Sequence, residues 1–414
     1  AGAFCLLPYV TGRPGDVVVG VYNPADPWTC GALPLALPEG DYVLHDRWPE
    51  AGRHSAALGW GLGAYQFCHY KKAPRGPARL GIAVGVDGAH LQRQLEALYW
   101  TRDLINTPAQ DLGPAALAAE AEALGNRFGA EVQVWVGEEL LHRGYPAVHA
   151  VGRAAWEAPR LVDLHWGDPQ HPRVTLVGKG VCFDSGGLDI KPAKGMRLMK
   201  KDMGGAAHAL GLGQWVMAAA LPVRLRVLIP IVENALGPGA FRPGDVLTMG
   251  NGLTVEVDNT DAEGRLILAD ALHAAGAEAP DLLVDFATLT GAARVALGTE
   301  VAVMLGNRPP RVEQLTAAGE ATFDPLWPLP LHDPYDDLLD STIADCVNAS
   351  SSGYGGAITA ALFLRRFVPP EVDWLHFDIM AWNVRPRPGR PEGGEAMGLR
   401  ALFHHLASWA THST

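Results

Sequence analysis

Cysteine is scarce in this sequence. Its 414 residues include five cysteines, an odd number, and no two of them form a Cys-x-x-Cys pair. This spacing argues against a disulfide framework and against a zinc site built from cysteines, and it favours a reducing compartment, the cytoplasm. We expect each thiol to act as a small buried apolar residue. The five are Cys5, Cys30, Cys68, Cys182 and Cys346.

Long apolar runs are missing as well. No stretch reaches the ~18 residues that a membrane-spanning helix needs. The start of the chain has no basic segment followed by an apolar one. We therefore expect neither a membrane partner nor a signal peptide.

Positive charge is in the minority. The sequence has 33 Lys and Arg against 45 Asp and Glu, which gives a formal net charge of −12. A protein that binds nucleic acid would normally carry a basic patch, and none of sufficient size is present, so we expect no nucleic-acid partner. The acidic balance favours solubility and says little about a substrate.

The length indicates two domains, because 414 residues exceed the usual size of a single hydrophobic core. Residues 1–88 contain apolar runs at Asp16–Tyr22 and Leu80–Val86 that predict strands, and a helical stretch at Ser55–Tyr70. We interpret this part as a small N-terminal α/β domain. A helical leucine pattern follows, and we expect residues 89–103 to connect it to a large domain at residues 104–414.

The large domain alternates strands with helices. Strands are predicted at Val174–Val177, Val223–Ile231 and Leu282–Phe286, with helices at Gly205–Ala220 and Leu266–Ala277. This alternation predicts an α/β fold with a central mixed, mostly parallel sheet flanked by helices.

Charged residues crowd three places in the large domain: after the strand Val174–Val177, after the next turn, and after a further predicted strand at Leu253–Val257. In α/β proteins, functional sites collect at the carboxyl ends of the strands. A lone Asp beside glycine is more often a turn or a helix cap, and that reading stays open for each residue taken singly. The residues concerned are Lys179, Asp184, Lys191, Asp202, Asp261, Glu263 and Arg265.

Asp261 and Glu263 are two residues apart, so both side chains would face the same way in an extended segment. Two carboxylates on one face repel each other unless a positive charge lies between them, and a divalent cation is the usual solution. The spacing alone therefore indicates a metal site.

Several motifs resemble those of the cytosolic leucyl aminopeptidase family. The segment Asn259–Leu266, which reads Asn-Thr-Asp-Ala-Glu-Gly-Arg-Leu, is similar to the signature octapeptide of that family. Further similar segments are Gly178–Gly180, Phe183–Gly187, Ile190–Pro192, Asp202–Ala206, Arg102–Pro108, Ala287–Ala292 and Gly353–Ala360. The resemblance implies that residues 104–414 form a catalytic domain. It implies a metal-dependent aminopeptidase that hydrolyses the N-terminal residue, leucine or another apolar one, from short peptides.

The resemblance also implies a role for each matching residue. Asp184 and Glu263 would bridge two divalent metal ions, Lys179 and Asp202 would complete the shell of one ion, and Asp261 would complete that of the other. Lys191 and Arg265 would be the catalytic pair, with a bicarbonate on Arg265 that shuttles a proton. The two ions would bind the substrate amine and activate a water molecule.

Electrostatics agree with this implied ligand set. The four carboxylates balance the charge of two divalent ions, and the ions would depress the pKa of Lys179, which can bind a metal only as a neutral amine. The chemistry of these ligands suits manganese, zinc, magnesium or cobalt, with Mn²⁺ or Zn²⁺ expected.

The family's pocket for the first side chain implies further residues here. Met199, Thr288, Leu289 and Gly291 would align the substrate. The segment Asp378–Trp382 is about two residues shorter than the family pattern, so Met380 is expected to protrude into the pocket. Arg197 stands where an acidic residue is common. The preferred side chain is therefore open, as is a dipeptidase or processive variant of the activity.

Three other readings are weaker. Gly178-Lys179-Gly180 lacks the spacing and the ending of a nucleotide-binding loop. A catalytically dead scaffold would have lost some of the seven implied metal and catalytic residues, and all are present. A DNA-binding protein would need a basic surface.

The family is typically a homohexamer, a dimer of trimers, which the resemblance implies for this chain.

Overall fold

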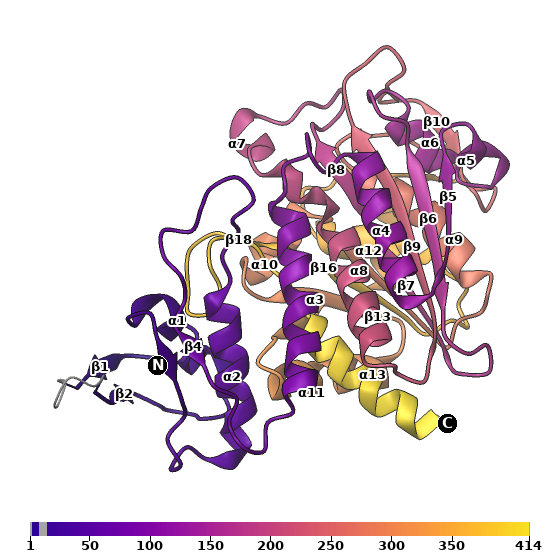
Figure 1. Cartoon of the computed structure of the whole chain (residues 1–414). Helices are drawn as coiled ribbons and strands as arrows, with labels where there is room; N and C mark the ends of the chain where they lie inside the picture. Colours follow the sequence, from indigo (N-terminus) through magenta and orange to yellow (C-terminus); the bar gives the residue numbers. More distant parts are fainter. Residues whose placement is uncertain (1, 8–14, 414) are drawn as a thin grey trace. The chain divides into compact units, whose positions relative to one another are not determined.

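The computed structural model describes residues 2–7 and 15–413, and the chain packs into two compact units (Figure 1). Unit 1 comprises Ala1–Tyr99 and Asn383–Gly393, and unit 2 comprises Trp100–Trp382 and Gly394–Thr414. This division differs in two ways from the boundaries expected from the sequence. It falls inside helix α3 (Gly88–Asn106) rather than on either side of it. It also assigns a segment near the C-terminus to the first unit.

Unit 1 is a small α/β unit. Strands β1 (Phe4–Leu6) and β2 (Val17–Val19) pair antiparallel, and β3 (Asp41–Tyr42) pairs parallel with β4 (Arg79–Leu80). Its helices are η1 (Pro27–Thr29), α1 (Leu33–Ala36) and α2 (Glu50–Ala64). The core of the unit consists of Cys30, Leu33, Leu37, Ala56, Trp60 and Ala78.

Two expected elements of unit 1 differ from those observed. The strand expected at Leu80–Val86 is limited to β4, and Ile82 and Val84 beyond it are 56% and 87% exposed. The helix expected at Ser55–Tyr70 is α2, which begins at Glu50 and ends at Ala64, because Tyr65 adopts an extended conformation (φ −60°, ψ 131°).

The segment Asn383–Gly393 packs into unit 1 through its backbone. The N–H of Gly389 donates to the carbonyl of Gly31 at 2.9 Å. A Cβ atom on Gly31 would lie 2.5 Å from the nitrogen of Gly389, so only glycine fits at this crossing. The guanidinium of Arg390 stacks 3.9 Å from the ring centre of Trp28.

Unit 2 is built on a mixed sheet. In the part of the chain that the structure describes, the strand order is β14-β13-β16-β12-β7-β9-β6-β5, and β8 lies beside β9. Strands β16, β12, β7 and β9 run parallel to their neighbours in this central group, and β8 is parallel to β9. The pairings β13–β16, β6–β9 and β5–β6 are antiparallel. The predicted mixed, mostly parallel sheet is confirmed.

The bounds of these strands follow the apolar runs of the sequence. They are β5 (Glu131–Val136), β6 (Arg160–Trp166), β7 (Arg173–Gly178), β8 (Gly180–Asp184), β9 (Arg224–Asn234), β12 (Leu282–Ala287), β13 (Ala302–Gly306), β14 (Leu326–Pro328) and β16 (Trp374–Asp378). Strand β12 is buried along its whole length, as expected for a strand covered on both faces.

Helices cover both faces of the sheet (Figure 1). Helices α4 (Pro114–Phe128) and α8 (Gly204–Ala218) pack on one face, with α13 (Leu399–Ser413) against α8. Helices α6 (Pro146–Gly152) and α9 (Glu263–Gly276) pack on the other face, with α12 (Gly356–Arg365) against α9. Nearly all of α8 is buried, because it lies between the sheet and α13.

The register of the parallel strands brings three strand ends together at one edge of the sheet. Gly178 at the end of β7 lies beside Phe286 of β12, and Ala287 of β12 lies beside Asp378 of β16. Lys179, Thr288 and Ile379, which follow these strand ends, therefore lie side by side at this edge. This is the edge at which α/β proteins place their functional sites.

The segment with Asp261 and Glu263 reaches this edge by a different route. It follows a small separate sheet of β10 (Val246–Thr248), β11 (Thr254–Glu256) and β15 (Cys346–Val347), not a strand of the main sheet. Asp261 lies in a turn and Glu263 is the first residue of α9. The expectation that the two carboxylates share one face of an extended segment was wrong.

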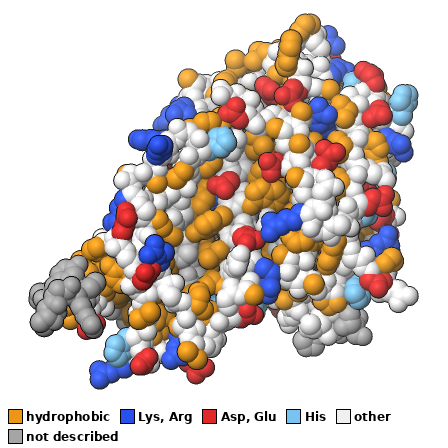
Figure 2. All heavy atoms as spheres, in the orientation of Figure 1, with side chains coloured by type: hydrophobic (Ala, Val, Ile, Leu, Met, Phe, Trp, Pro, Cys, Tyr) orange, Lys and Arg blue, Asp and Glu red, His pale blue; other side chains and the backbone are white. Residues whose placement is uncertain are grey.

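Two further properties of the whole chain bear on its partners. Among residues 2–7 and 15–413, no helix combines the length and hydrophobicity that a membrane span requires. Figure 2 shows acidic and basic side chains interspersed over the face in view.

Candidate metal centre

Glycines allow the segments of this centre to approach one another closely. A Cβ atom on Gly205, at the start of α8, would lie 2.1 Å from the carbonyl oxygen of Phe286. A Cβ atom on Gly264, in the first turn of α9, would lie 2.4 Å from Cε of Lys179. The backbone of Phe286 and the side chain of Lys179 can approach this closely only because Gly205 and Gly264 have no Cβ atom.

Three carboxylates converge at the sheet edge. Asp184 ends β8, Asp202 lies in the short 3₁₀ helix η2 (Met199–Met203), and Glu263 begins α9. An oxygen of each lies within 4.8 Å of an oxygen of the other two, and all three side chains are buried. Such a group of buried oxygens is suited to a divalent cation.

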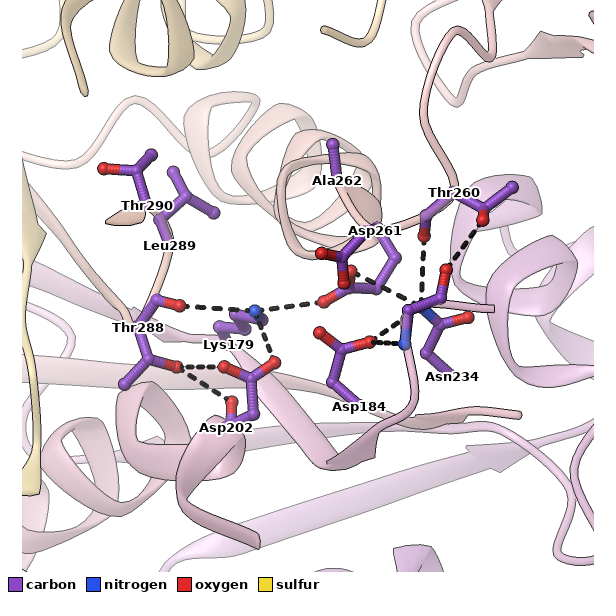
Figure 3. A network of polar contacts seen from close by, with 12 residues as sticks. Lys179, Asp184, Asp202, Asn234, Thr260, Asp261, Ala262, Thr288, Leu289 and Thr290 are labelled. Carbon is purple, nitrogen blue, oxygen red and sulfur yellow. Dashed lines mark hydrogen bonds and ion pairs between the residues drawn. The ribbon is translucent and has the colours of Figure 1, made fainter. Parts of the chain in front are cut away.

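Lys179 lies among these carboxylates, at the junction between β7 and β8 (Figure 3). Its Nζ is 2.6 Å from Oδ2 of Asp202 and 3.0 Å from Oε1 of Glu263. Burial by itself would lower the pKa of Lys179, but the surrounding carboxylates raise it well above its usual range. A metal ion at this position would replace the charge of the ammonium, and Lys179 would then bind it as a neutral amine.

Lys191 approaches the same cluster from the loop after β8. Its Nζ is 2.7 Å from Oδ2 of Asp184 and also pairs with Oδ1 of Asp261. Burial opposes the charge of Lys191, yet Asp184 and Asp261 raise its pKa above the ordinary value. The structure thus brings together the five expected metal-binding residues and one of the two expected catalytic residues.

The negative charges of the carboxylates in this cluster repel one another. Burial and then the charge of Asp184 raise the pKa of Glu263, and the same two causes raise that of Asp261. Both groups would gain from an added positive charge. The donor set of carboxylate oxygens and one amine therefore fits divalent metal ions.

Asn234 holds this cluster together and was not expected from the sequence. It ends β9 and is buried, and its Nδ2 donates to Oδ1 of Asp184 at 2.8 Å and to the carbonyl of Thr260 at 3.0 Å (Figure 3). A third contact reaches Oε2 of Glu263 at 3.5 Å. Asn234 thereby fixes groups from three segments. An asparagine at the end of an apolar strand carries no sequence signal for this role.

Thr260 and Asn348 order the loop before α9. The hydroxyl of Thr260 donates to the carbonyl of Gly186 at 2.7 Å and accepts the N–H of Asp189 at 2.9 Å. Asn348 accepts the N–H of Asp258 at 2.8 Å through Oδ1, and its Nδ2 donates to the carbonyl of Asn259 at 2.7 Å. These bonds set the position of Asp261 and Glu263.

Arg265 lies two residues after Glu263, in the first turn of α9. It is 8% exposed, and its Nη1 donates to the carbonyl of Asn348 at 2.8 Å. Burial lowers the pKa of Arg265 to about 10, although Asp378 and Glu263 act in the opposite direction. At neutral pH the group is charged.

The loop after β12 lies against the cluster. The hydroxyl of Thr288 donates to Oδ1 of Asp202 at 2.7 Å, and its carbonyl is 3.5 Å from Nζ of Lys179. A Cβ atom on Gly291 would meet no atom within 4 Å, so this position faces open space. The loop therefore connects the carboxylate cluster with a surface open to a ligand.

Asp378 fixes this loop from behind. It is buried at the end of β16 and accepts the N–H of Leu289 at 3.0 Å, and the N–H and hydroxyl of Thr290 at 3.1 and 2.6 Å. The next residues carry the expected pocket residue Met380, which is half-buried, and Ala381, which adopts a positive φ of 54°. The expected pocket residue Met199 is also half-buried, at the start of η2.

Lys201 belongs to the pair Lys200-Lys201, which the sequence leaves open as solvated charge or as part of a loop beside Asp202. A pair of lysines usually indicates solvated charge, but Lys201 is 2% exposed, and its Nζ has no hydrogen-bond partner among the described residues. Burial, and then the charge of Arg294, lower the pKa of Lys201 to about 7. Its neighbour Lys200 instead donates to the carbonyl of Asn106 at 2.5 Å.

Comparison with known proteins decides the family. Residues 99–403 match the cytosol aminopeptidase family, catalytic domain, and residues 1–83 match the M17 aminopeptidase, N-terminal domain. The chain belongs to the cytosol aminopeptidase family. It is accordingly a metallo-aminopeptidase, a hydrolase, as the resemblance of its motifs implied.

Related sequences and structures agree with this assignment. The "Probable cytosol aminopeptidase" of Geobacter sp. (strain M21) is 42% identical over 85% of this chain and 74% of its own length. The crystal structure of the cytosol aminopeptidase from Coxiella burnetii is 49% identical, with a TM-score of 0.95 over 99% of this chain and 89% of that one.

Two similar structures that contain ligands have lower sequence identity to this chain. The bottromycin maturation enzyme BotP in complex with Mn is 35% identical, with a TM-score of 0.91 over 99% of this chain and 94% of that chain. The leucyl aminopeptidase from Trypanosoma brucei in complex with bestatin is 30% identical, with a TM-score of 0.80 over 89% and 73%.

Proposed function

We propose that this aminopeptidase removes the N-terminal residue, leucine or another apolar one, from short peptides with two divalent metal ions. The observation that supports this most is the convergence of five potential ligands from separate segments around one buried point. These ligands are Lys179, Asp184, Asp202, Asp261 and Glu263.

Each ligand has a proposed place. Asp184 and Glu263 would bind both ions, Lys179 and Asp202 one of them, and Asp261 the other. When bound, the ions would supply Lewis acidity and an activated water at neutral pH. Mn²⁺ or Zn²⁺ are proposed, and the manganese complex of BotP supports the first.

Lys191 and Arg265 are the proposed catalytic residues. Lys191 lies beside Asp184 with its ammonium directed at the cluster, so it can donate a hydrogen bond to the scissile carbonyl and stabilise the negative charge that develops there. Arg265 is a buried cation whose Nε has no hydrogen-bond partner among the described residues, so it can hold an anion. A bicarbonate is proposed as that anion and as carrier of the proton.

The proposed substrate pocket lies on the open side of the loop after β12. Thr288, Leu289 and Gly291 would align the peptide, and Met199 and Met380 would contact the first side chain. The half-buried thioethers suit an apolar residue. Assembly as a homohexamer, a dimer of trimers, and a cytoplasmic location are proposed from the family and from the names of the relatives.

The first experiment measures release of para-nitroaniline from leucine-para-nitroanilide by metal-stripped protein after addition of Mn²⁺, Zn²⁺ or Mg²⁺. We expect metal-dependent release that is absent with amino-acetylated leucine-para-nitroanilide. The Glu263→Ala variant should be inactive, whereas Glu313→Ala, an exposed glutamate of unit 2, should match the unmodified protein. No release with any metal or first residue would contradict the proposal and favour a scaffold role.

A further inference from the structure

The segment Lys191–Lys201 carries charge of one sign only. It contains five cations, Lys191, Lys194, Arg197, Lys200 and Lys201, and no acidic residue, in a chain whose formal net charge is −12. Figure 2 shows that charges of both signs are mixed over the face in view. A concentration of positive charge in one short segment of an acidic protein therefore calls for a physical explanation.

Both ends of this segment are fixed at the metal centre. Lys191 pairs with Asp184 at one end, and Lys201 directly precedes Asp202 at the other. The residues between them form the single-turn helix α7 (Ala193–Met196) and the turn that follows it, in which Lys194 and Arg197 are exposed. Because its two ends are held at the cluster, the exposed middle forms part of the rim around it.

Three of the five cations already have a partner or are buried. Lys191 pairs with carboxylates, Lys200 donates to the carbonyl of Asn106 and lies 5.5 Å from the ring centre of Trp382, and Lys201 is buried. Lys194 and Arg197 remain, and neither has a carboxylate within 4.0 Å in the part of the chain that the structure describes.

The acids nearest to them in sequence are occupied. Oδ2 of Asp189 accepts the N–H of Thr260 at 2.8 Å, and Asp202 pairs with Lys179 and accepts the hydroxyl of Thr288. The charges of Lys194 and Arg197 are therefore available to a ligand that approaches the metal centre.

We propose that Lys194 and Arg197 bind acidic side chains of the peptide beyond its first residue, so that acidic peptides are the preferred substrates. This rests on the proposed function, in which Lys191 contacts the scissile carbonyl. Lys194 lies three residues after Lys191 in the same segment, and in this proposal the part of the peptide beyond the scissile bond passes the rim that carries both cations.

The size of the effect follows from the exposure of both cations. Each exposed ion pair changes affinity by a factor of about two to five, and a lysine in the peptide would be repelled where an aspartate is attracted. We expect kcat/KM for Leu-Asp-Ala to exceed that for Leu-Lys-Ala by about tenfold at low ionic strength. The ratio should approach one in about 0.5 M NaCl, because salt screens exposed charges.

The experiment measures kcat/KM of the Mn²⁺-loaded full chain for Leu-Asp-Ala, Leu-Lys-Ala, Leu-Ala-Ala and Glu-Ala-Ala. The Lys194→Glu/Arg197→Glu variant should prefer Leu-Lys-Ala, and the single variants Lys194→Gln and Arg197→Gln should each show a reduced ratio. The matched control is Arg127→Glu/Arg143→Glu, which makes the same charge change at other exposed positions of unit 2 and should keep the preference for Leu-Asp-Ala.

Four outcomes would overturn the inference. The unmodified enzyme could hydrolyse Leu-Asp-Ala and Leu-Lys-Ala equally, or the control could lose the preference as fully as the charge-reversed variant, which would indicate net charge rather than the rim. A preference for Glu-Ala-Ala over Leu-Ala-Ala that depends on Arg197 would assign the cations to the first side chain instead. Failure to hydrolyse all four peptides would overturn the proposed function as well, whereas hydrolysis without a charge preference would overturn the inference alone.

Discussion

Lys201 is enclosed without a partner for its amine. Its side chain is 2% exposed, and no hydrogen-bond acceptor among the described residues contacts Nζ. We predict that Lys201→Met, which keeps the length of the side chain and removes the amine, raises the free energy of unfolding by about 1 kcal/mol. Urea denaturation measures this, with the exposed Lys194→Met as a control that should change little. A loss of stability in Lys201→Met would show that the amine has a favourable interaction in solution.

Asp378 acts on the substrate through the loop that it holds. Asp378→Asn keeps Oδ1 as an acceptor but replaces Oδ2, which accepts the hydroxyl of Thr290 at 2.6 Å, by an amide donor. We predict a fall in kcat of about tenfold or more with unchanged metal content, because the loop shifts relative to the cluster. Steady-state kinetics and metal analysis check this, with the exposed Asp281→Asn as control. Full activity of Asp378→Asn would rule out the positioning role.

His208 must be neutral in the folded chain. It donates through Nδ1 to the carbonyl of Gly204 at 2.6 Å and accepts the N–H of Met397 through Nε2 at 2.9 Å. Burial lowers the pKa of His208 to about 4.

This arrangement predicts a dependence of stability on pH. The unfolded chain binds a proton below about pH 6.5, and the folded chain does so only near pH 4, so stability is present above pH 6.5 and is lost as the pH falls. The loss should reach on the order of 3 kcal/mol at pH 4. Urea denaturation at several pH values should show a smaller pH dependence in His208→Leu than in the unmodified protein. Equal slopes would contradict the prediction.

The candidate ligand residues, which the structure brings together, could be singled out from the sequence, because short motifs carry them and each needs a specific functional group. The hydrogen-bonding roles of Asn234, Thr260 and Asn348 could not be predicted, because hydrogen bonds between distant segments leave no local pattern. The burial of Lys201 could not be predicted either, since a lysine pair in a loop resembles solvated charge until η2 turns one side chain inward.

At the scale of elements, one buried carboxylate joins helix α9 to helix α6. Oδ2 of Asp270 accepts the N–H groups of Ala147 and Val148 at 2.7 and 3.3 Å, and Oδ1 accepts the N–H of Gly250 at 2.9 Å. Burial raises the pKa of Asp270 to about 7, against the effect of these three donors. Helix α9 also carries Glu263 and Arg265, so this contact helps to fix the metal centre.

We predict that Asp270→Ala lowers the free energy of unfolding by about 2–4 kcal/mol, because two buried N–H groups and one half-buried N–H group lose their acceptor. Asp270→Asn keeps one acceptor oxygen, so its free energy of unfolding should lie between those of the unmodified protein and Asp270→Ala. Chemical denaturation measures both. A small effect of the alanine variant would mean that water or a shift of α6 satisfies these groups.

The elements themselves were predicted unevenly. Helices and strands of unit 2 follow strong apolar periodicity, so α8, α9, β7 and β12 lie within a few residues of their expected bounds. The short strands of unit 1 depend on pairing partners far along the chain, and the apolar run at Leu80–Val86 has a partner only at its beginning. Pairing cannot be read from such runs alone.

At the scale of the whole molecule, metal binding should stabilise the fold. A ligand that binds only the native state adds RT ln(1 + [L]/Kd), about 2.7 kcal/mol at a hundredfold excess over Kd. We predict that a chelator lowers the melting temperature of the Mn²⁺-loaded protein and that Glu263→Ala no longer responds to Mn²⁺. Differential scanning calorimetry measures this, with Glu313→Ala as control. An unchanged melting temperature after complete metal removal would argue against binding at this cluster.

The chain passes between its two units three times, at Tyr99, Trp382 and Gly393. Unit 1 is therefore not a removable N-terminal appendage, because Gly389 and Arg390 pack on Gly31 and Trp28 from the far end of the sequence. In genetic terms, a recombination event that exchanged only the first part of the gene would bring together backbone surfaces that had not evolved with each other. The parts of the gene that encode Gly31 and Gly389 are thus expected to be inherited together.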